Sequence, residues 1–237
     1  MTPIITLAKK ELRGLLYSPS GYIFSGLMAG LAIWLFSNDL FLLGQADVGP
    51  LVSTMSYLLT LFVPAVAMGI IAEEKKNGTW ENLMTWPITE WQVVTGKFLG
   101  YGIYLIISLG LIVPIMASMV ILGFSEIGLL FSNFLMLVLL SWCFLGVTLV
   151  ASSLSSQPMV ALAGSLIFLL VNSLLGNGSL TSRLDPNLQN FFTQLSLSWR
   201  TQRLGSGLIE LGNLWFLVTF LVGCLIAATL IIRGRNR

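Results

Sequence analysis

Six long apolar segments dominate this sequence and limit what it can fold into. A helix needs about 20 apolar residues to cross the hydrocarbon core of a bilayer. The composition agrees with such crossings, because the chain is 56% hydrophobic and 9% charged, whereas soluble domains carry about a quarter charged residues. We expect an all-α integral membrane protein with six transmembrane helices and a single domain over residues 1–237. The apolar segments cover residues 21–43, 51–72, 98–122, 129–154, 159–175 and 211–232.

The positions of the basic residues predict how these helices are oriented. Loops on the cytoplasmic side of a membrane protein carry an excess of Lys and Arg. With the N-terminus inside, nine basic residues fall on the cytoplasmic side, and three fall outside in the long connection over residues 176–210. We therefore expect both termini in the cytoplasm.

The residues before the first apolar segment have the pattern of an amphipathic helix. Apolar residues repeat at helical spacing over 4–16, while Lys9, Lys10 and Arg13 gather on the opposite side of the helix. A helix of this kind lies in the membrane interface, here on the inner leaflet. The alternative is a frayed basic tail that serves only to set the topology.

The loop over residues 73–97 concentrates charge in a chain that otherwise has little of it. Asn77-Gly78 tolerates the left-handed conformation, so we expect the second membrane helix to continue to about Lys76 and stop there. Thr79 then predicts the cap of a short helix over residues 80–85. The loop is thus expected to contain a short helix between two breaks.

The same loop carries an aromatic and apolar surface beside the headgroups. Trp86-Pro87 ends the short helix, because the residue before a proline avoids the helical region. Thr89 and Gln92 predict a capping box that begins the third membrane helix. We interpret the surface as a patch that inserts into the groove of a partner; the alternative is an ordinary interfacial loop anchored by its tryptophans. The patch comprises Trp80, Leu83, Met84, Trp86 and Trp91.

Several classes of function are excluded by what the chain lacks. The cores of the apolar segments hold no ionisable side chain, whereas ion-coupled carriers place such groups within the bilayer. The chain has no histidine, which rules out Ser-His catalysis and His-ligated metal. Gly96-Lys97 is followed by Phe98 and so does not form a phosphate-binding loop. We expect no catalytic residue, no metal site and no bound ATP, so energy for transport would come from another subunit.

Glycines and prolines inside the apolar segments predict local geometry. Gly26 and Gly30 lie one turn apart and allow another helix to approach closely; we favour a contact within the bundle over a dimer seam. Gly96 and Gly100 have the same spacing at the start of the third segment. In the outer connection, an amphipathic helix over residues 186–195 would either close the mouth of a pathway or pack over the bundle. Kinks are expected at the two internal prolines, Pro64 and Pro114.

Residues 73–83 read Glu-Glu-Lys-Lys-Asn-Gly-Thr-Trp-Glu-Asn-Leu. They resemble the Glu-(Arg/Lys)-x-x-Gly-Thr-x-Glu-x-Leu signature of type-2 ABC transporter permeases. The turn at residues 87–89, the Gly-Lys entry into the third helix and the basic N-terminal helix resemble other parts of that family. Residues 191–207 are similar to its GldF-like and NosY-like branch, so the resemblance covers nearly the full length.

The resemblance implies a non-enzymatic permease subunit of an ATP-binding cassette exporter in the inner (plasma) membrane. It implies a coupling helix over residues 80–85 that docks on a separate nucleotide-binding subunit, which would bind ATP and Mg. The basic helix would be a connecting helix in contact with lipids. Contacts at the joint are implied for Glu73, Glu74, Lys75, Gly78, Thr79, Trp80, Glu81, Leu83, Met84, Trp86 and Pro87.

The resemblance also implies a second permease, identical or paralogous, beside this chain in a homodimer or heterodimer, and no nucleic-acid partner. A different class of function stays open alongside this one. The chain would then be a non-transporting membrane scaffold that recruits a cytoplasmic partner through the loop over residues 73–97.

Overall fold

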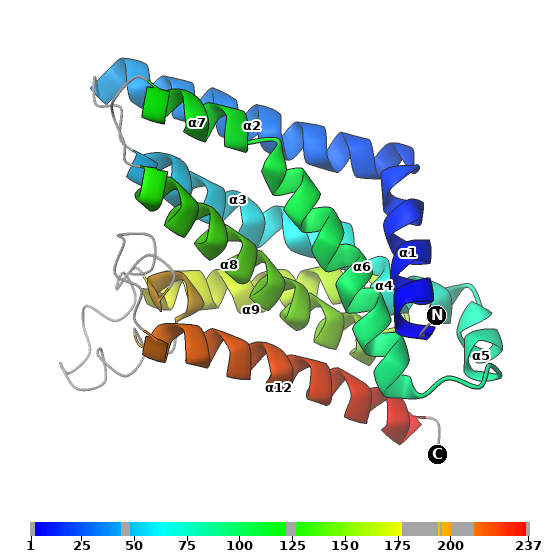
Figure 1. Ribbon diagram of the computed structural model, residues 1–237. Helices are drawn as coiled ribbons and strands as arrows, with labels where there is room; N and C mark the ends of the chain where they lie inside the picture. The colour runs from blue at the N-terminus through cyan, green and yellow to red at the C-terminus, as the bar shows by residue number, and fades with distance from the viewer. Residues whose placement is uncertain are drawn as a thin grey trace.

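The computed structural model describes residues 3–43, 48–121, 127–176, 194, 196–200 and 211–235. Regular structure in these ranges is helical throughout, in agreement with the expected all-α class (Figure 1). The principal helices are α1 (Pro3–Leu16), α2 (Pro19–Leu43), α3 (Val48–Ala67), α4 (Gly69–Lys76), α5 (Thr79–Met84), α6 (Glu90–Gly110), α7 (Val113–Ile121), α8 (Ile127–Leu154), α9 (Pro158–Gly176) and α12 (Leu211–Arg235).

Five stretches of helix in the described ranges are long and apolar enough to cross a membrane. The chain is therefore a multi-pass membrane protein. The first predicted segment corresponds to α2, which runs over Pro19–Leu43. At 1.5 Å per residue, the 25 residues of α2 are long enough for the roughly 30 Å of a hydrocarbon core. The five stretches are Leu51–Lys76, Glu90–Ser118, Ile127–Leu154, Pro158–Gly176 and Gly212–Gly234.

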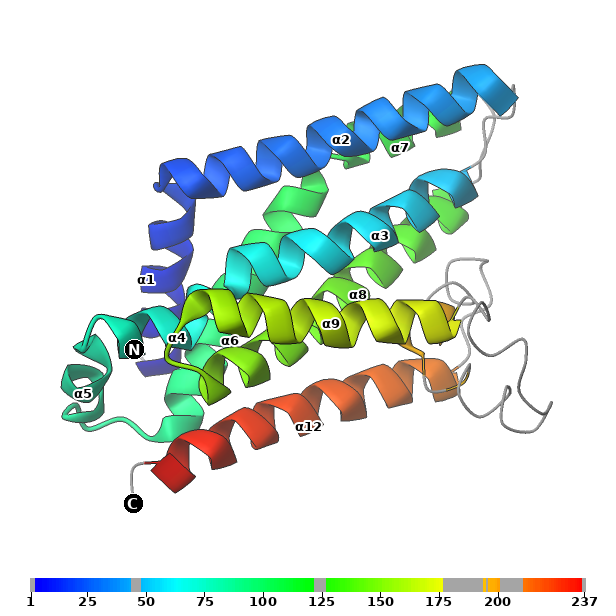
Figure 2. The same ribbon diagram turned by 180° about the vertical axis from the view of Figure 1, so that it is seen from behind.

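Helix α8 is the centre of the bundle. It packs against α3, α4, α6, α7, α9 and α12 (Figures 1 and 2). Its most apolar stretch is 67% buried inside the protein, against 22% for α9 and for α12, which lie at the periphery. An element that contacts α8 is thus connected, through this single helix, to most of the other helices of the bundle.

One end of the bundle carries both termini, α1 and α5 (Figures 1 and 2). There α1 runs across the direction of the long helices, in the orientation expected of an interfacial helix, and it packs along α6. Residues 3–16 form a regular helix, so the alternative of a frayed basic tail is wrong. The shared position of the termini agrees with the expectation that both lie on one side of the membrane.

The kink predicted at Pro114 coincides with a break between helices, whereas α3 continues through Pro64 to Ala67. The second span changes from α3 to α4 at Met68, four residues after Pro64. The third span changes from α6 to α7 at residues 111–112, directly before Pro114. Pro114 lacks the N–H that would bond the carbonyl of Gly110, the last residue of α6, which accounts for the second break only. The capping box at the start of α6 is also confirmed, with reciprocal hydrogen bonds between Thr89 and Gln92.

The two glycine pairs behave differently. A Cβ placed on Gly26 or Gly30 would meet no heavy atom within 4 Å in the described part of the chain, so the favoured contact within the bundle is wrong. The reason is that α2 touches only α3, α6 and the end of α1 to any extent. A Cβ on Gly96 would lie 3.0 Å from Leu7, and one on Gly100 would lie 2.8 Å from α1. Gly96 and Gly100 are therefore the residues of α6 against which α1 packs.

At the other end of the bundle, residues 196–200 form hydrogen bonds with both α9 and α12. The Asn172 side chain accepts a hydrogen bond from the N–H of Leu197 (2.9 Å). Arg200 donates to Asn213 of α12 (3.0 Å). The half-buried Asn172 and the buried Asn213 thus form hydrogen bonds between separate segments of the chain. The helix expected over residues 186–195 lies outside the described residues except for residue 194.

Candidate functional site

The candidate site is the junction of α1, α4, α5 and α6, and its first element is the turn between α4 and α5. The N–H of Gly78 donates to the carbonyl of Lys75 (3.3 Å), and Gly78 has a φ of 70°. Asn77 keeps a right-handed conformation, so one residue makes the turn and α5 resumes directly after it. Thr79 therefore lies inside α5, and its hydroxyl donates to the carbonyl of Glu74 (3.3 Å). The prediction that Thr79 caps a helix over 80–85 is wrong: Gly78 is the cap.

Replacement of Gly78 tests this turn. A Cβ at Gly78 has no heavy atom within 4 Å, so any penalty comes from the left-handed backbone alone. We expect Gly78→Ala to lower the free energy of unfolding by about 1–2 kcal/mol. Gly78→Asn should cost less, because Asn adopts this conformation more readily. Thermal unfolding in one detergent, followed by tryptophan fluorescence, measures both; equal melting temperatures for the wild-type and Gly78→Ala proteins would contradict the assignment.

A buried ion cluster joins three of the four helices. The Lys97 ammonium of α6 lies 3.0 Å from Glu11 Oε1 of α1 and 2.8 Å from Glu74 Oε1 of α4. Lys97 is 1% exposed. Lys10 adds contacts of 3.4 Å to Glu11 and 3.8 Å to Glu74, but its side chain is 63% exposed. Solvent screens the Lys10 pairs far more than the Lys97 pairs, so Lys97 is the ion that holds the junction together.

Glycine makes this cluster possible. α1 crosses α6 at Gly96 and Gly100, so close that a Cβ on Gly100 would lie 2.8 Å from the carbonyl oxygen of Ala8 and 2.8 Å from Glu11 Cβ. Small residues let helix backbones approach in this way. The close crossing brings the short Glu11 side chain within reach of Lys97. The packing of α1 on Gly96 and Gly100 and the formation of the ion cluster therefore depend on the same helix crossing.

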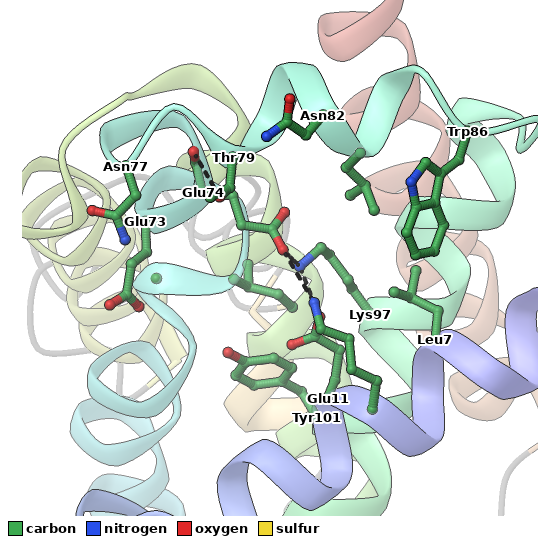
Figure 3. A pocket seen from close by; sticks show the side chains of 14 residues that line it. Leu7, Glu11, Glu73, Glu74, Asn77, Thr79, Asn82, Trp86, Lys97 and Tyr101 are labelled. Atoms are coloured by element: carbon green, nitrogen blue, oxygen red, sulfur yellow. Dashed lines mark hydrogen bonds and ion pairs between the residues drawn. The ribbon is translucent and has the colours of Figure 1, made fainter.

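A cavity of about 570 Å³ opens between these helices (Figure 3). Carboxylates and amides surround it, with apolar side chains behind them. Glu74 uses one oxygen for Lys97, while its other oxygen, Oε2, is buried without a hydrogen-bond partner in the described part of the chain. Glu73 is exposed at the same cavity. The polar lining comprises Lys10, Glu11, Glu73, Glu74, Asn77, Thr79, Asn82, Lys97 and Tyr101.

The aromatic residues of the loop separate into one buried and two exposed side chains. Trp80 is 8% exposed, with the Lys75 ammonium 5.7 Å from its ring centroid. The prediction that Trp80 belongs to the exposed apolar surface is wrong, because α5 turns this face toward α4. Trp86 and Trp91 are 63% and 41% exposed. Leu83 is half-buried, and the side chain of Met84 lies outside the described residues.

The remaining predicted residues lie on the surface of the same end. Glu81 in the first turn of α5 and Pro87 after it are both exposed. Lys9 and Arg13 are exposed on α1. Lys10 instead contacts the ion cluster, so the basic side of α1 is divided between solvent and the junction. No group of three His, Cys, Asp or Glu side chains in the described ranges is placed to hold a metal ion.

Sequence reasoning missed Glu11 and Lys97 as site residues. A lysine or a glutamate near the end of an apolar segment ordinarily reaches the headgroups, and nothing local distinguishes these two. The glycines at positions 96 and 100 were the available signal. They mark where a second helix crosses α6, and a charge directly beside such a crossing is covered by that helix.

The fold and the junction define a class: a helical multi-pass membrane protein with a short helix, α5, in the connection between two spans. The profile of the ABC-2 family transporter proteins matches residues 5–230, and the chain belongs to this family. It is 28% identical over 189 residues to "Probable ABC transporter permease protein NosY" of Stutzerimonas stutzeri, covering 72% of this chain and 68% of that protein. It is 26% identical over 243 aligned positions to the NosY permease protein of Pseudomonas aeruginosa, covering 90% and 88%.

The family confirms the resemblance and identifies a membrane permease subunit of an ABC transporter. Membership implies an ABC ATPase as the partner within the transporter. It also agrees with a transmembrane subunit that is not itself catalytic.

Proposed function

We propose that the chain is the permease of an ATP-driven exporter and that α5 is its coupling helix. A separate nucleotide-binding subunit would bind ATP and Mg and hydrolyse the ATP, and this chain would hold no cofactor. The observation that carries the proposal is the Lys97 cluster. It joins the two arms that flank α5, α4 and α6, to each other through a contact of 2.8 Å, and joins α6 to α1 through a contact of 3.0 Å. A push on α5 therefore reaches two spans at once.

The exposed side chains near α5 supply the docking surface. Trp86 and Trp91 are large, rigid and accessible, as the anchor residues of protein interfaces often are. Glu81 adds charge at the edge of α5. Trp80 would act from inside by holding α5 against Lys75, which in turn donates to the Ser153 carbonyl of α8 (2.5 Å). In this arrangement the partner touches the outer face while the inner face transmits movement.

The placement in the membrane forms part of the same proposal. The chain is one permease domain with six spans, α2 included, in the inner membrane. The α5 end and both termini face the cytoplasm, which the positions of the basic residues support. Exposed Lys9 and Arg13 on α1 would contact anionic headgroups. A second permease, identical or paralogous, would complete the transporter.

Trp86→Ala tests the docking proposal. Truncation of an interface anchor commonly costs 2 kcal/mol or more, so we expect at least a tenfold loss of ATPase subunit recovered with the tagged permease in mild detergent. Trp215→Ala is the matched control, because Trp215 is 72% exposed on α12 and lies outside the junction; its recovery should equal that of the wild type. Equal recovery with Trp86→Ala would contradict the assignment of α5. Absence of any ATPase from the wild type would favour the scaffold.

A further inference from the structure

Ser152 of α8 lies at the break between α3 and α4. It is fully buried. Its Oγ accepts hydrogen bonds from the N–H groups of Ile71 (3.1 Å) and Ala72 (2.9 Å), and it donates to the carbonyl oxygen of Met68 (2.9 Å). One side chain of the fourth predicted span thus bonds three backbone groups of the second.

These three contacts use the full capacity of the hydroxyl, which has one donor and two acceptor positions. Ala72 N–H and Met68 C=O are the donor and acceptor of a single turn of helix. A side chain placed at such a pair is a recognised cause of a helix bend. Because the site is buried, bonds here are stronger than in water and an unpaired backbone group is costly. The hydroxyl therefore stabilises the bend at Met68.

The neighbouring residue provides a second contact and an internal comparison. The Ser153 carbonyl accepts from the Lys75 ammonium (2.5 Å), so α4 is bonded to the end of α8 at two successive positions. The Ser153 hydroxyl, by contrast, donates only to Val150 within its own helix (2.7 Å). Both serines are fully buried. Their side chains differ in whether they reach the second span.

We propose that Ser152 is a positioning residue that fastens α4, and with it the arm that carries α5, to the central helix α8. The hinge at Met68–Gly69 is thereby held in one bend, and α4 moves with the cytoplasmic end of α8. A displacement of α5 passes through α8 to α3, α9 and α12, in addition to its route through α6. The attachment of α4 to α8 is inferred from the hydrogen bonds of Ser152 alone. Only the role of this attachment in transmitting movement rests on the proposed function.

The test measures the orientation of the arm relative to α8 in the full chain. Spin labels are placed at Asn82 of α5 and Phe131 near the start of α8, both exposed, with Cys143 and Cys224 changed to alanine. Double electron–electron resonance then gives the distribution of distances in detergent or nanodiscs. We expect one narrow distribution for the parent chain and for Ser153→Ala. For Ser152→Ala we expect at least a twofold broader distribution or a second maximum.

A distribution for Ser152→Ala that matches the parent would overturn the proposal, and so would equal broadening in both alanine variants. If Ser152→Ala does not fold, Ser152→Cys replaces it, with both labels carried by unnatural amino acids so that the new thiol stays unlabelled; we expect an intermediate width, and a parental width would overturn the proposal. The measurement needs no ATPase. The distance measurement on Ser152→Ala and the ATPase recovery with Trp86→Ala are therefore independent, and each result can be interpreted when the other proposal fails.

Discussion

Lys97→Met is expected to be the most destabilising single change at the junction. It removes the only buried cation of the cluster and leaves the carboxylates of Glu11 and Glu74 facing each other, with side chains 13% and 18% exposed. Loss of one partner of a buried ion pair costs about 3–5 kcal/mol. The partial exposure of both glutamates favours the lower value, about 3 kcal/mol. For a chain of this size that corresponds to a fall in Tm of roughly 6–12 °C.

Two controls separate charge from packing in this experiment. Lys10→Met removes a cation from the same cluster that is 63% exposed, and its effect should stay below about 1 kcal/mol. Adding Glu11→Gln and Glu74→Gln to Lys97→Met removes the uncompensated charge and should recover most of the loss. Thermal unfolding of the four proteins in one detergent measures these effects. Equal stability of the Lys97→Met and Lys10→Met proteins would contradict the central place of Lys97.

Gly100→Val is expected to displace α1 from α6. The first added atom would already lie 2.8 Å from the Ala8 carbonyl oxygen and from Glu11 Cβ, and a branched side chain requires more room. Overpacking of this kind typically costs about 1–3 kcal/mol. Because the displaced backbone carries Glu11, the contact with Lys97 should weaken too. If the free energy needed to open α1 locally falls by about 1.4 kcal/mol, the open form becomes roughly ten times more populated, and the rate of proteolysis rises by the same factor.

Limited trypsin digestion reports this opening directly, because α1 contains Lys9, Lys10 and Arg13. The matched control is Gly110→Val in the same helix, where an added Cβ would meet nothing within 4 Å of the described residues. Its rate of cleavage within α1 should equal that of the parent. A parental rate for Gly100→Val would mean that α1 does not depend on this crossing.

Local sequence signals predicted most of the helices. Hydropathy located the long spans, and the apolar repeat located α1 to within a residue of its observed start. The capping box of Thr89 and Gln92 was predicted because it is formed by residues three apart. The break before Pro114 follows from the missing N–H of proline. Each of these features depends on interactions within a few residues of chain.

The site was less predictable because its contacts join distant parts of the chain. Lys97 and Glu11 are 86 residues apart, and Ser152 and Ala72 are 80 apart. No periodicity within one helix encodes such a pair. Trp80 was misplaced for a related reason: the face that α5 turns inward is chosen by its packing against α4. Gly26 and Gly30 gave a real spacing, but spacing alone did not say whether a neighbour is present.

The distribution of charge gives the junction its functional interest. The apolar cores of the spans carry no ionisable side chain, so the charges are concentrated where α1, α4, α5 and α6 meet. A permease built this way would bind no coupling ion within the bilayer. Under the proposed function it would receive energy as movement at the end that carries α5, and the ion cluster and Ser152 would transmit that movement to α1, α6 and α8.

The most direct test of this account is a photo-crosslinking residue at Asn82, which is exposed on α5, activated in native membranes and followed by mass spectrometry of the adducts. If α5 docks on the ATPase, the dominant adduct should be with an ATPase that contains a phosphate-binding loop. The same residue at Phe131, exposed near the start of α8, should give no such adduct. Adducts at Asn82 that contain only lipid, or that match those at Phe131, would contradict the claim that α5 docks on an ATPase.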